Sequence, residues 1–127
     1  MPPRHQHLIL LVEDDADTRA GVAELLRLDG YAVVEAGDGR EALRRLRRDP
    51  RPCVVLLDLS MLVTSGWRFR ALQLGDRRIA CVPVVAFSGH EGVAQQSSRL
   101  QLAGYLAKPL DLDKLRTSIQ QACPMAA

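Results

Sequence analysis

The stretch "CVVLLDLSM", Cys53 to Met61, decides how the rest of the chain is interpreted. Its apolar residues follow one another without a break, which is typical of a strand buried on both faces of a parallel sheet. The run ends at Asp58, and a carboxylate that leaves a buried strand is costly unless water, a metal or a partner meets it. We therefore expect Asp58 to lie at the end of a strand and to have a partner there.

Four further apolar runs have the length and composition of buried strands: Leu8 to Val12, Tyr31 to Ala36, Val82 to Ser88 and Gly104 to Lys108. They alternate with five amphipathic stretches, two of which, near Trp67 to Leu74 and Gly92 to Leu102, are less clearly bounded. This alternation is the pattern of repeated βα units. The sequence therefore predicts an α/β fold, a doubly wound sandwich around a parallel sheet.

Short polar signals mark where the helices begin and end. Asp38 is followed three residues later by Glu41, which is the spacing of a capping box, and Asp111 is placed to cap the last helix. We expect Gly30 to end the first helix and Pro50 to end the second.

The composition is that of an ordinary domain, and we expect a single domain over residues 1–127, with its core at about 8–122 and short tails at 1–7 and 123–127. The chain is 47% hydrophobic, and its net charge of +2 is too small to indicate a nucleic-acid partner. No apolar segment reaches the ~20 residues that a membrane helix needs, and the N-terminus lacks the apolar core of a signal peptide. We expect no membrane contact and a cytoplasmic location.

The three cysteines, Cys53, Cys81 and Cys123, are an odd number and lack CxxC spacing. This pattern indicates neither a disulfide framework nor a zinc site. We expect two of them to pack as small apolar residues at strand starts.

Polar side chains gather where the predicted strands end: Glu13, Asp14 and Asp15 after the first run, Asp58 after the third, Ser88 after the fourth and Lys108 after the fifth. Ligands of doubly wound folds bind in the crevice at the carboxyl ends of the strands. Close carboxylates repel unless a cation lies among them, and Mg²⁺ takes one or two carboxylates while leaving room for a phosphoryl oxygen. We expect Asp14 and Asp58 to ligate Mg²⁺ directly and Glu13 to act through water.

The same crevice favours a small phosphoryl group over a nucleotide. Its first strand ends in acid, where a dinucleotide site would carry GxGxxG. Lys108 is placed to pair with a phosphoryl group, and Ser88 to donate to one of its oxygens. Asp58 is the carboxylate that would accept the group, because a metal-bound Asp can act as a covalent nucleophile. Asp15 is expected to cap the first helix instead.

The order of these residues resembles the receiver domain of two-component response regulators. The resemblance rests on Glu13-Asp14, Asp58, Ser88 and Lys108-Pro109, in that order, and extends from about Leu8 to Ala122. It implies a five-stranded parallel sheet in the flavodoxin-like order 2-1-3-4-5. It also implies a role for each site residue: Asp58 as phosphoacceptor; Asp14, Asp58 and the backbone carbonyl of Ser60 as Mg²⁺ ligands, with Glu13 completing the acidic pocket; Lys108 as partner of the phosphoryl group; and Ser88 with Tyr105 as the switch pair.

The resemblance implies a phosphorylation-controlled signalling switch in the bacterial cytoplasm. A sensor histidine kinase or phosphotransfer protein would supply the phosphoryl group. A protein partner would then bind the face of the fourth helix, fifth strand and fifth helix, without direct contact to nucleic acid. The chain would catalyse only its own phosphotransfer and dephosphorylation. It would be either a stand-alone receiver of the chemotaxis type or a segment of a longer protein.

Some positions depart from the family pattern. Leu62 stands where Pro is usual and Ser65 where Asp is frequent, so the loop that carries Ser60 is expected to be looser and the Mg²⁺ affinity lower. His90, two residues beyond Ser88, either orients water near the phosphoryl group or is an exposed loop residue.

Two other functions stay open. A phosphohydrolase of the haloacid dehalogenase type also uses an Asp nucleophile, but it needs a second Asp where Ser60 stands. A degenerate receiver that binds its partner without phosphorylation is the alternative to the switch.

Overall fold

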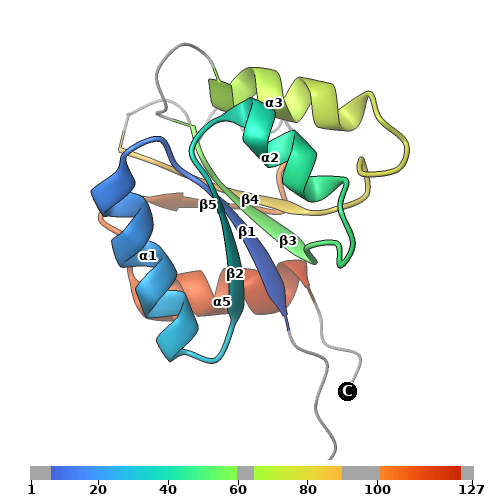
Figure 1. Cartoon of the computed structure of the whole chain (residues 1–127). Coiled ribbons are helices and arrows are strands. Elements are labelled where there is room, and N and C mark those ends of the chain that lie inside the picture. Colours follow the sequence, from blue (N-terminus) through green and yellow to red (C-terminus); the bar gives the residue numbers. More distant parts are fainter. Residues whose placement is uncertain (1–6, 60–64, 90–100, 124–127) are drawn as a thin grey trace, which may run out of the picture.

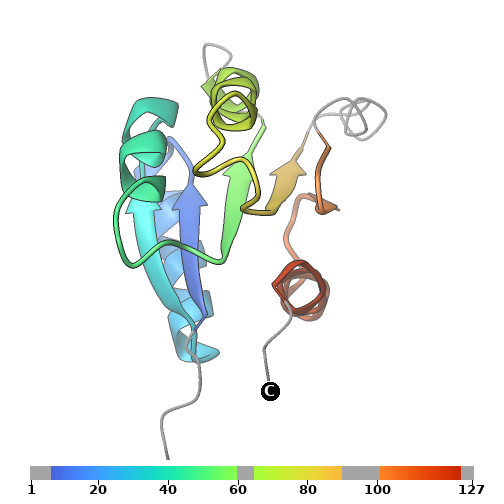
Figure 2. The same cartoon turned by 90° about the vertical axis from the view of Figure 1, so that its right-hand side faces the viewer.

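The strands of the chain form one parallel sheet in the order β2-β1-β3-β4-β5 (Figures 1 and 2). This computed structural model describes residues 7–59, 65–89 and 101–123. The strands are β1 (Leu8–Val12), β2 (Ala32–Ala36), β3 (Val54–Asp58), β4 (Val84–Ser88) and β5 (Gly104–Ala107). The order confirms the predicted doubly wound α/β fold, in which the chain reverses its winding after β2.

Helices cover both faces of the sheet. The described helices are α1 (Ala16–Leu28), α2 (Gly39–Leu46), α3 (Ser65–Leu74) and α5 (Leu112–Ala122). One face lies against α2 and α3 and the other against α1 and α5 (Figure 1). The fourth predicted helix, from Gly92 to Leu102, lies outside the described residues except for its last two positions. Among the described residues, no helix is both long enough and apolar enough to cross a membrane.

The central strands are apolar without a break because helices cover both faces of the sheet. In β1, Leu10 and Val12 face the core under α2 and α3, while Ile9 and Leu11 face the core under α1 and α5. All four side chains are fully buried, and so are those of the apolar residues of β3 and β4. Because successive residues of a strand point to opposite faces, a strand buried on both sides has no position for a polar residue before its end. A carboxylate can therefore occupy β3 only at its last position, which is Asp58.

The predicted helix N-caps are confirmed. The Asp15 carboxylate accepts a hydrogen bond from the Thr18 backbone N–H at 2.9 Å, and Asp38 and Asp111 cap α2 and α5 in the same way. The capping box at α2 is only half formed, because the Glu41 carboxylate accepts from the Gly37 backbone N–H at 3.4 Å rather than from that of Asp38.

Of the two predicted helix ends, the first is confirmed and the second is not. Gly30, with φ of +95°, directly follows the Asp29 C-cap of α1, as predicted. Helix α2 ends at Leu46, so the prediction that Pro50 ends it is wrong.

Two cysteines were expected to pack at strand starts, and for Cys81 this prediction is wrong. Cys81 is exposed, because β4 begins only at Val84 and Cys81 lies in the loop before it. Cys53, which immediately precedes β3, is half-buried, and Cys123 at the end of α5 is buried.

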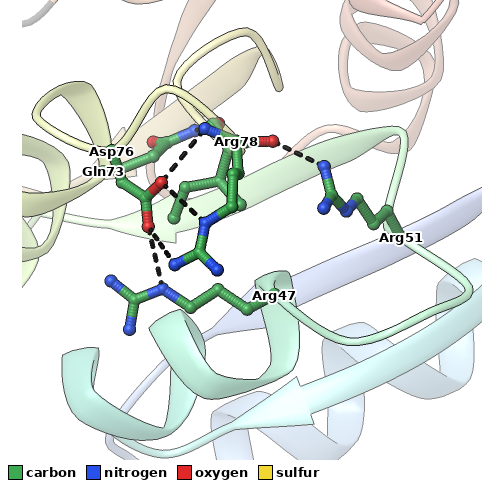
Figure 3. A network of polar contacts seen from close by, with 6 residues as sticks. Arg47, Arg51, Gln73, Asp76 and Arg78 are labelled. Atoms are coloured by element: carbon green, nitrogen blue, oxygen red, sulfur yellow. Dashed lines mark hydrogen bonds and ion pairs between the residues drawn. The ribbon is translucent and has the colours of Figure 1, made fainter.

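A polar network joins the end of α2 to the loop after α3 (Figure 3). The Asp76 carboxylate accepts from Arg47 Nε at 3.0 Å and from the Arg78 backbone N–H at 3.0 Å. Arg51, in the arginine-rich stretch after α2, donates to the Arg78 carbonyl at 2.6 Å. Two arginines of the basic cluster at the end of α2 thus have partners within the chain.

This network gives the stability of the protein a dependence on pH. The hydrogen bonds from Arg78 and Arg47 lower the pKa of Asp76 from 3.8 to about 2. Because the pKa is lower in the folded protein than in the unfolded chain, the stabilisation is present above 3.8 and is lost as the pH falls toward about 2. We expect Asp76→Asn to lower the Tm at neutral pH and to leave it unchanged near pH 2, as measured by circular dichroism. Asp49→Asn, at a carboxylate that is 94% exposed, is the matched control and should have little effect at either pH. A Tm difference for Asp76→Asn that is the same at both pH values would contradict this account.

Candidate functional site

Three carboxylates meet where β1 and β3 end. In the sheet Val12 is the register partner of Leu57, so the residues that follow, Glu13 and Asp58, emerge side by side. Oxygens of Glu13, Asp14 and Asp58 lie within 4.8 Å of one another. Glu13 and Asp58 are buried, whereas Asp14 is exposed. The crossover from β2 to β3 makes β1 and β3 neighbours, and this is why the two distant acidic segments form one pocket.

Lys108 brings a positive charge to this pocket from the end of β5. Its Nζ lies 3.2 Å from Asp58 Oδ2 and 3.7 Å from Glu13 Oε1. The Lys108 backbone N–H donates to the Ser88 carbonyl at 3.1 Å, which fixes the start of the side chain. The ammonium also lies 5.4 Å from the centre of the Phe87 ring, at a distance that suits a cation–π contact. Lys108 is therefore held over Asp58 from two sides while it stays partly exposed.

The pocket holds more negative charge than Lys108 can balance. Burial, together with the hydrogen bond and charge of Asp58, raises the pKa of Glu13 from 4.5 to about 8, and the charge of Lys108 partly opposes this shift. The second oxygen of this carboxyl group, Oε2, is buried and has no hydrogen-bond partner among the described residues. A buried carboxylate oxygen without a partner is expensive. A cation among these carboxylates would offset their charge and give this oxygen a ligand.

The donor set fits a hard divalent cation. Mg²⁺ binds carboxylate and carbonyl oxygens and keeps several waters. The pocket offers three carboxylates, and its Asp14 side is open to solvent for those waters. The orphaned oxygen of Glu13 is the observation that speaks most directly for such an ion.

Ser88 and Tyr105 lie on neighbouring strands of the sheet. Ser88 ends β4, is buried, and pairs in register with Ala107 of β5. Tyr105 is half-buried on β5, which is an edge strand as predicted, and pairs with Ala86. Since side chains alternate along a strand, Ser88 and Tyr105 belong to the same face of the sheet. This placement is compatible with coupled motion of the two, and their switch role stays a prediction.

Other residues singled out in the sequence fall outside the described part of the chain. Ser60, Leu62 and His90 lie outside the residues that the structure describes. Ser65 is the first residue of α3, and its side chain is also outside the description. Sequence reasoning in turn missed two residues at the pocket. Phe87 lies against Lys108, and Arg19 of α1 donates to the Glu13 carbonyl at 2.8 Å. Strand alternation was a signal for Phe87, but nothing in the sequence pointed to Arg19.

The acidic pocket and its lysine lie at the carboxyl ends of the strands of a five-stranded doubly wound sheet. The model of the family described as the response regulator receiver domain matches residues 9–120. The chain therefore belongs to the response regulator receiver family.

Individual relatives agree with this assignment. The transcriptional regulatory protein PdtaR of Mycobacterium tuberculosis is 32% identical over 115 residues, which are 90% of this chain and 55% of PdtaR. Sporulation initiation phosphotransferase F of Bacillus subtilis is 28% identical over 92% of this chain and 94% of its own length. The chain spans about half the length of PdtaR and, at 46%, of the transcriptional regulatory protein PrrA from the same Mycobacterium.

Solved structures share the whole fold. A response regulator receiver protein from Pseudomonas putida superposes with a TM-score of 0.84 at 27% identity, over 94% of this chain and 99% of its own. The chemotaxis protein CheY4 of Vibrio cholerae has a TM-score of 0.82 at 25% identity, over 92% and 98% of the two chains.

Proposed function

We propose that this receiver is a phosphoacceptor switch of a two-component phosphorelay and that Asp58 is the residue phosphorylated. The observation that carries the proposal is the buried Asp58 carboxylate, 3.2 Å from the Lys108 ammonium and within 4.8 Å of the oxygens of two further acids. A carboxylate in such a position can attack a phosphoryl group while the neighbouring cation balances the charge of the phosphoryl oxygens.

The transfer itself needs little from the protein beyond position and charge. An oxygen of Asp58 forms a bond to the phosphorus of a phosphohistidine, the phosphorus–nitrogen bond breaks, and the electron pair returns to the imidazole of the donor. Lys108 pairs with one phosphoryl oxygen. Asp14, Asp58 and the Ser60 carbonyl would hold Mg²⁺, with Glu13 acting through water, and the bound ion supplies charge neutralisation for the phosphoryl oxygens.

The acyl phosphate then shifts the equilibrium between two conformations. The Ser88 hydroxyl donates to a phosphoryl oxygen, and Tyr105 turns into the space that Ser88 leaves. Support comes from the position of Ser88 at the end of β4 and from the half-buried Tyr105 on the same face of the neighbouring edge strand. The changed surface would be that of the fourth helix, β5 and α5, where a protein partner binds.

The phosphoryl donor is a histidine kinase or a phosphotransfer protein. A relative that is 28% identical over 91% of this chain is named the CAI-1 autoinducer sensor kinase/phosphatase CqsS of Vibrio cholerae, and another relative is named a phosphotransferase. A hollow of about 640 Å³ adjoins Lys108 and is lined mainly by apolar groups, among them Leu25, Phe87 and Pro109. Such a surface beside the acceptor suits the docking of a protein donor.

The Mg²⁺ requirement tests this function. We expect incubation with acetyl phosphate and Mg²⁺ to give a single phosphoryl adduct, and replacement of Mg²⁺ by EDTA to remove it, because the three carboxylates then repel the incoming phosphate. Intact-protein mass spectrometry measures both. Equal adduct with EDTA would contradict the metal role. A protein that accepts no phosphoryl group from acetyl phosphate or from a phosphohistidine donor would point to the degenerate binding module, whose partner should bind wild type and Asp58→Ala equally well.

A further inference from the structure

Two thiols and an imidazole meet at the edge of the sheet opposite to the acidic pocket. His7 immediately precedes β1, Cys53 immediately precedes β3, and Cys123 caps the end of α5. Figure 1 shows the end of α5 beside the start of β1. The amino ends of the strands lie at this edge, whereas Asp58 lies at their carboxyl ends, so the cluster is separate from the phosphorylation site.

The three side chains converge on one point. His7 Nδ1 lies 3.2 Å from the Cys123 sulfur and 3.4 Å from the Cys53 sulfur, and all three atoms lie within 4.8 Å of one another. Both thiol sulfurs thus contact the same ring nitrogen, Nδ1 of His7. Ligation of a metal through Nδ1 would use its lone pair and place the ring proton on Nε2.

The backbone holds each of these residues in place. The Cys53 N–H donates to the Leu8 carbonyl at 2.8 Å, and the Cys123 N–H donates to the Ile119 carbonyl at 2.8 Å. The His7 carbonyl accepts from the Ala32 N–H at 3.0 Å. The His7 ring also packs edge-on against Tyr31, with 5.8 Å between ring centres. The cluster is therefore carried by the sheet and by α5, and its ligand atoms are preorganised.

The spacing is close to that of a tetrahedral zinc site. Bonds of about 2.3 Å to sulfur and about 2.0–2.1 Å to nitrogen, at tetrahedral angles, separate the sulfur and nitrogen ligands by about 3.6 Å. The observed sulfur–nitrogen distances of 3.2 and 3.4 Å need to open by only a few tenths of an ångström. Cysteine and histidine are also the ligand types that Zn²⁺ prefers.

We propose that His7, Cys53 and Cys123 form a binding site for one Zn²⁺ ion, with the fourth tetrahedral position left to water. Binding releases the two thiol protons to solvent and leaves two thiolates and the neutral imidazole on the metal. Such a site would join the start of the chain's first strand, its middle and its last helix.

Zinc binding at this site should depend on pH, because Zn²⁺ binds the thiolate and displaces the thiol proton. Burial and the neighbouring Cys123 raise the pKa of the metal-free Cys53 thiol to about 12, which opposes binding at neutral pH and makes the affinity rise with pH.

Cobalt substitution tests the site. We expect one equivalent of Co²⁺, added to the reduced full chain in the presence of excess Mg²⁺, to give thiolate-to-cobalt charge-transfer absorption and the strong visible bands of tetrahedral Co²⁺, both lost when Zn²⁺ is added. Excess Mg²⁺ competes for the acidic pocket, and oxygen ligands there give no sulfur charge transfer. Native mass spectrometry should count one Zn²⁺ per chain.

Three variants separate this site from other thiols. Loss of an outer-shell partner alone costs about 10–100-fold in metal affinity, so Cys53→Ser and Cys123→Ser should weaken Zn²⁺ binding at least about 100-fold. Cys81→Ser removes the exposed cysteine and should change nothing. His7→Gln at the partly buried first ligand provides a further test if a serine variant fails to fold, with folding checked by circular dichroism.

Several outcomes would overturn the proposal. These are charge transfer that survives in the double variant Cys53→Ser/Cys123→Ser, charge transfer lost in Cys81→Ser, or reduced protein that binds no Zn²⁺. A cobalt spectrum without sulfur bands that disappears in Asp58→Asn would place the cation in the acidic pocket instead.

Discussion

Asp58→Asn is expected to reduce the phosphoryl adduct below detection under the conditions in which wild type is modified. The amide that replaces the carboxylate has no anionic oxygen to attack phosphorus, and it removes one of the charges that would hold the metal. Asn has nearly the same shape as Asp, and Lys108 keeps its contact to Glu13 at 3.7 Å, so the fold should persist. Intact-protein mass spectrometry after incubation with acetyl phosphate and Mg²⁺ measures the adduct, and circular dichroism checks the fold.

The matched control for this experiment is Asp49→Asn. Asp49 is 94% exposed and lies between α2 and β3, on the side of the sheet where β3 begins rather than ends. The substitution Asp49→Asn makes the same change, from carboxylate to amide, and should leave the amount of phosphoryl adduct at the level of wild type. An adduct that persists in Asp58→Asn and maps to Asp14 or Glu13 would move the acceptor within the pocket and would disprove the role of Asp58.

Gln73→Leu is expected to have the largest effect on stability. Gln73 is fully buried, and its amide nitrogen donates to the carbonyls of Ile79 and Val82, at 2.9 Å in each case. Its oxygen accepts from Arg70 Nη1 at 2.7 Å. Leu fills a similar volume but makes none of these hydrogen bonds. The Ile79 carbonyl keeps the hydrogen bond from the Val82 N–H at 3.2 Å, whereas the Val82 carbonyl and Arg70 Nη1 lose the one that Gln73 makes. A buried polar group left without a partner costs about 1–3 kcal/mol and a lost hydrogen bond to a charged group about 1.5–3 kcal/mol, so we expect a loss of roughly 3 kcal/mol in the free energy of unfolding.

Urea unfolding followed by circular dichroism measures this loss. Gln120→Leu, at an exposed position of α5, is the control and should stay within about 0.5 kcal/mol of wild type. Since the loss comes from the folded state, the midpoint should fall while the slope m stays the same. A midpoint for Gln73→Leu equal to that of the control would show that water or rearranged neighbours satisfy the exposed carbonyls.

The sequence predicted the strands well and their starts less well. Leu8–Val12 matches the predicted run at both ends, but Tyr31, Cys53 and Val82 belong to predicted runs and lie before the strands. Tyr31 shows the reason, because its N–H donates to the Leu26 carbonyl at 3.0 Å and so completes the end of α1. Hydrophobicity indicates that a residue is buried, not that it is hydrogen-bonded in a sheet. An apolar residue can therefore be buried although it lies before the first paired residue of the strand.

The acidic pocket was predictable because its residues are brought together by topology alone. Once parallel strands are inferred, the residues that end them must share one edge. The cluster of His7, Cys53 and Cys123 follows no such rule. Its members lie 116 and 46 positions apart, and the meeting depends on where α5 ends. A search for closely spaced metal-ligand motifs therefore indicates no zinc site, even though the structure brings these ligand atoms together.

The strand order has a mechanical consequence for a switch of the proposed kind. Asp58 ends β3, which is hydrogen-bonded to a neighbour on each side, whereas Tyr105 lies on β5, which has β4 on one side only. A strand held along a single border is displaced at a lower free energy than one held along two. In the proposed switch, the acceptor would thus lie on the central strand and Tyr105 on one of the two edge strands. Phosphorylation of Asp58 would then displace an edge of the sheet while the strand that holds the reacting atoms keeps its position.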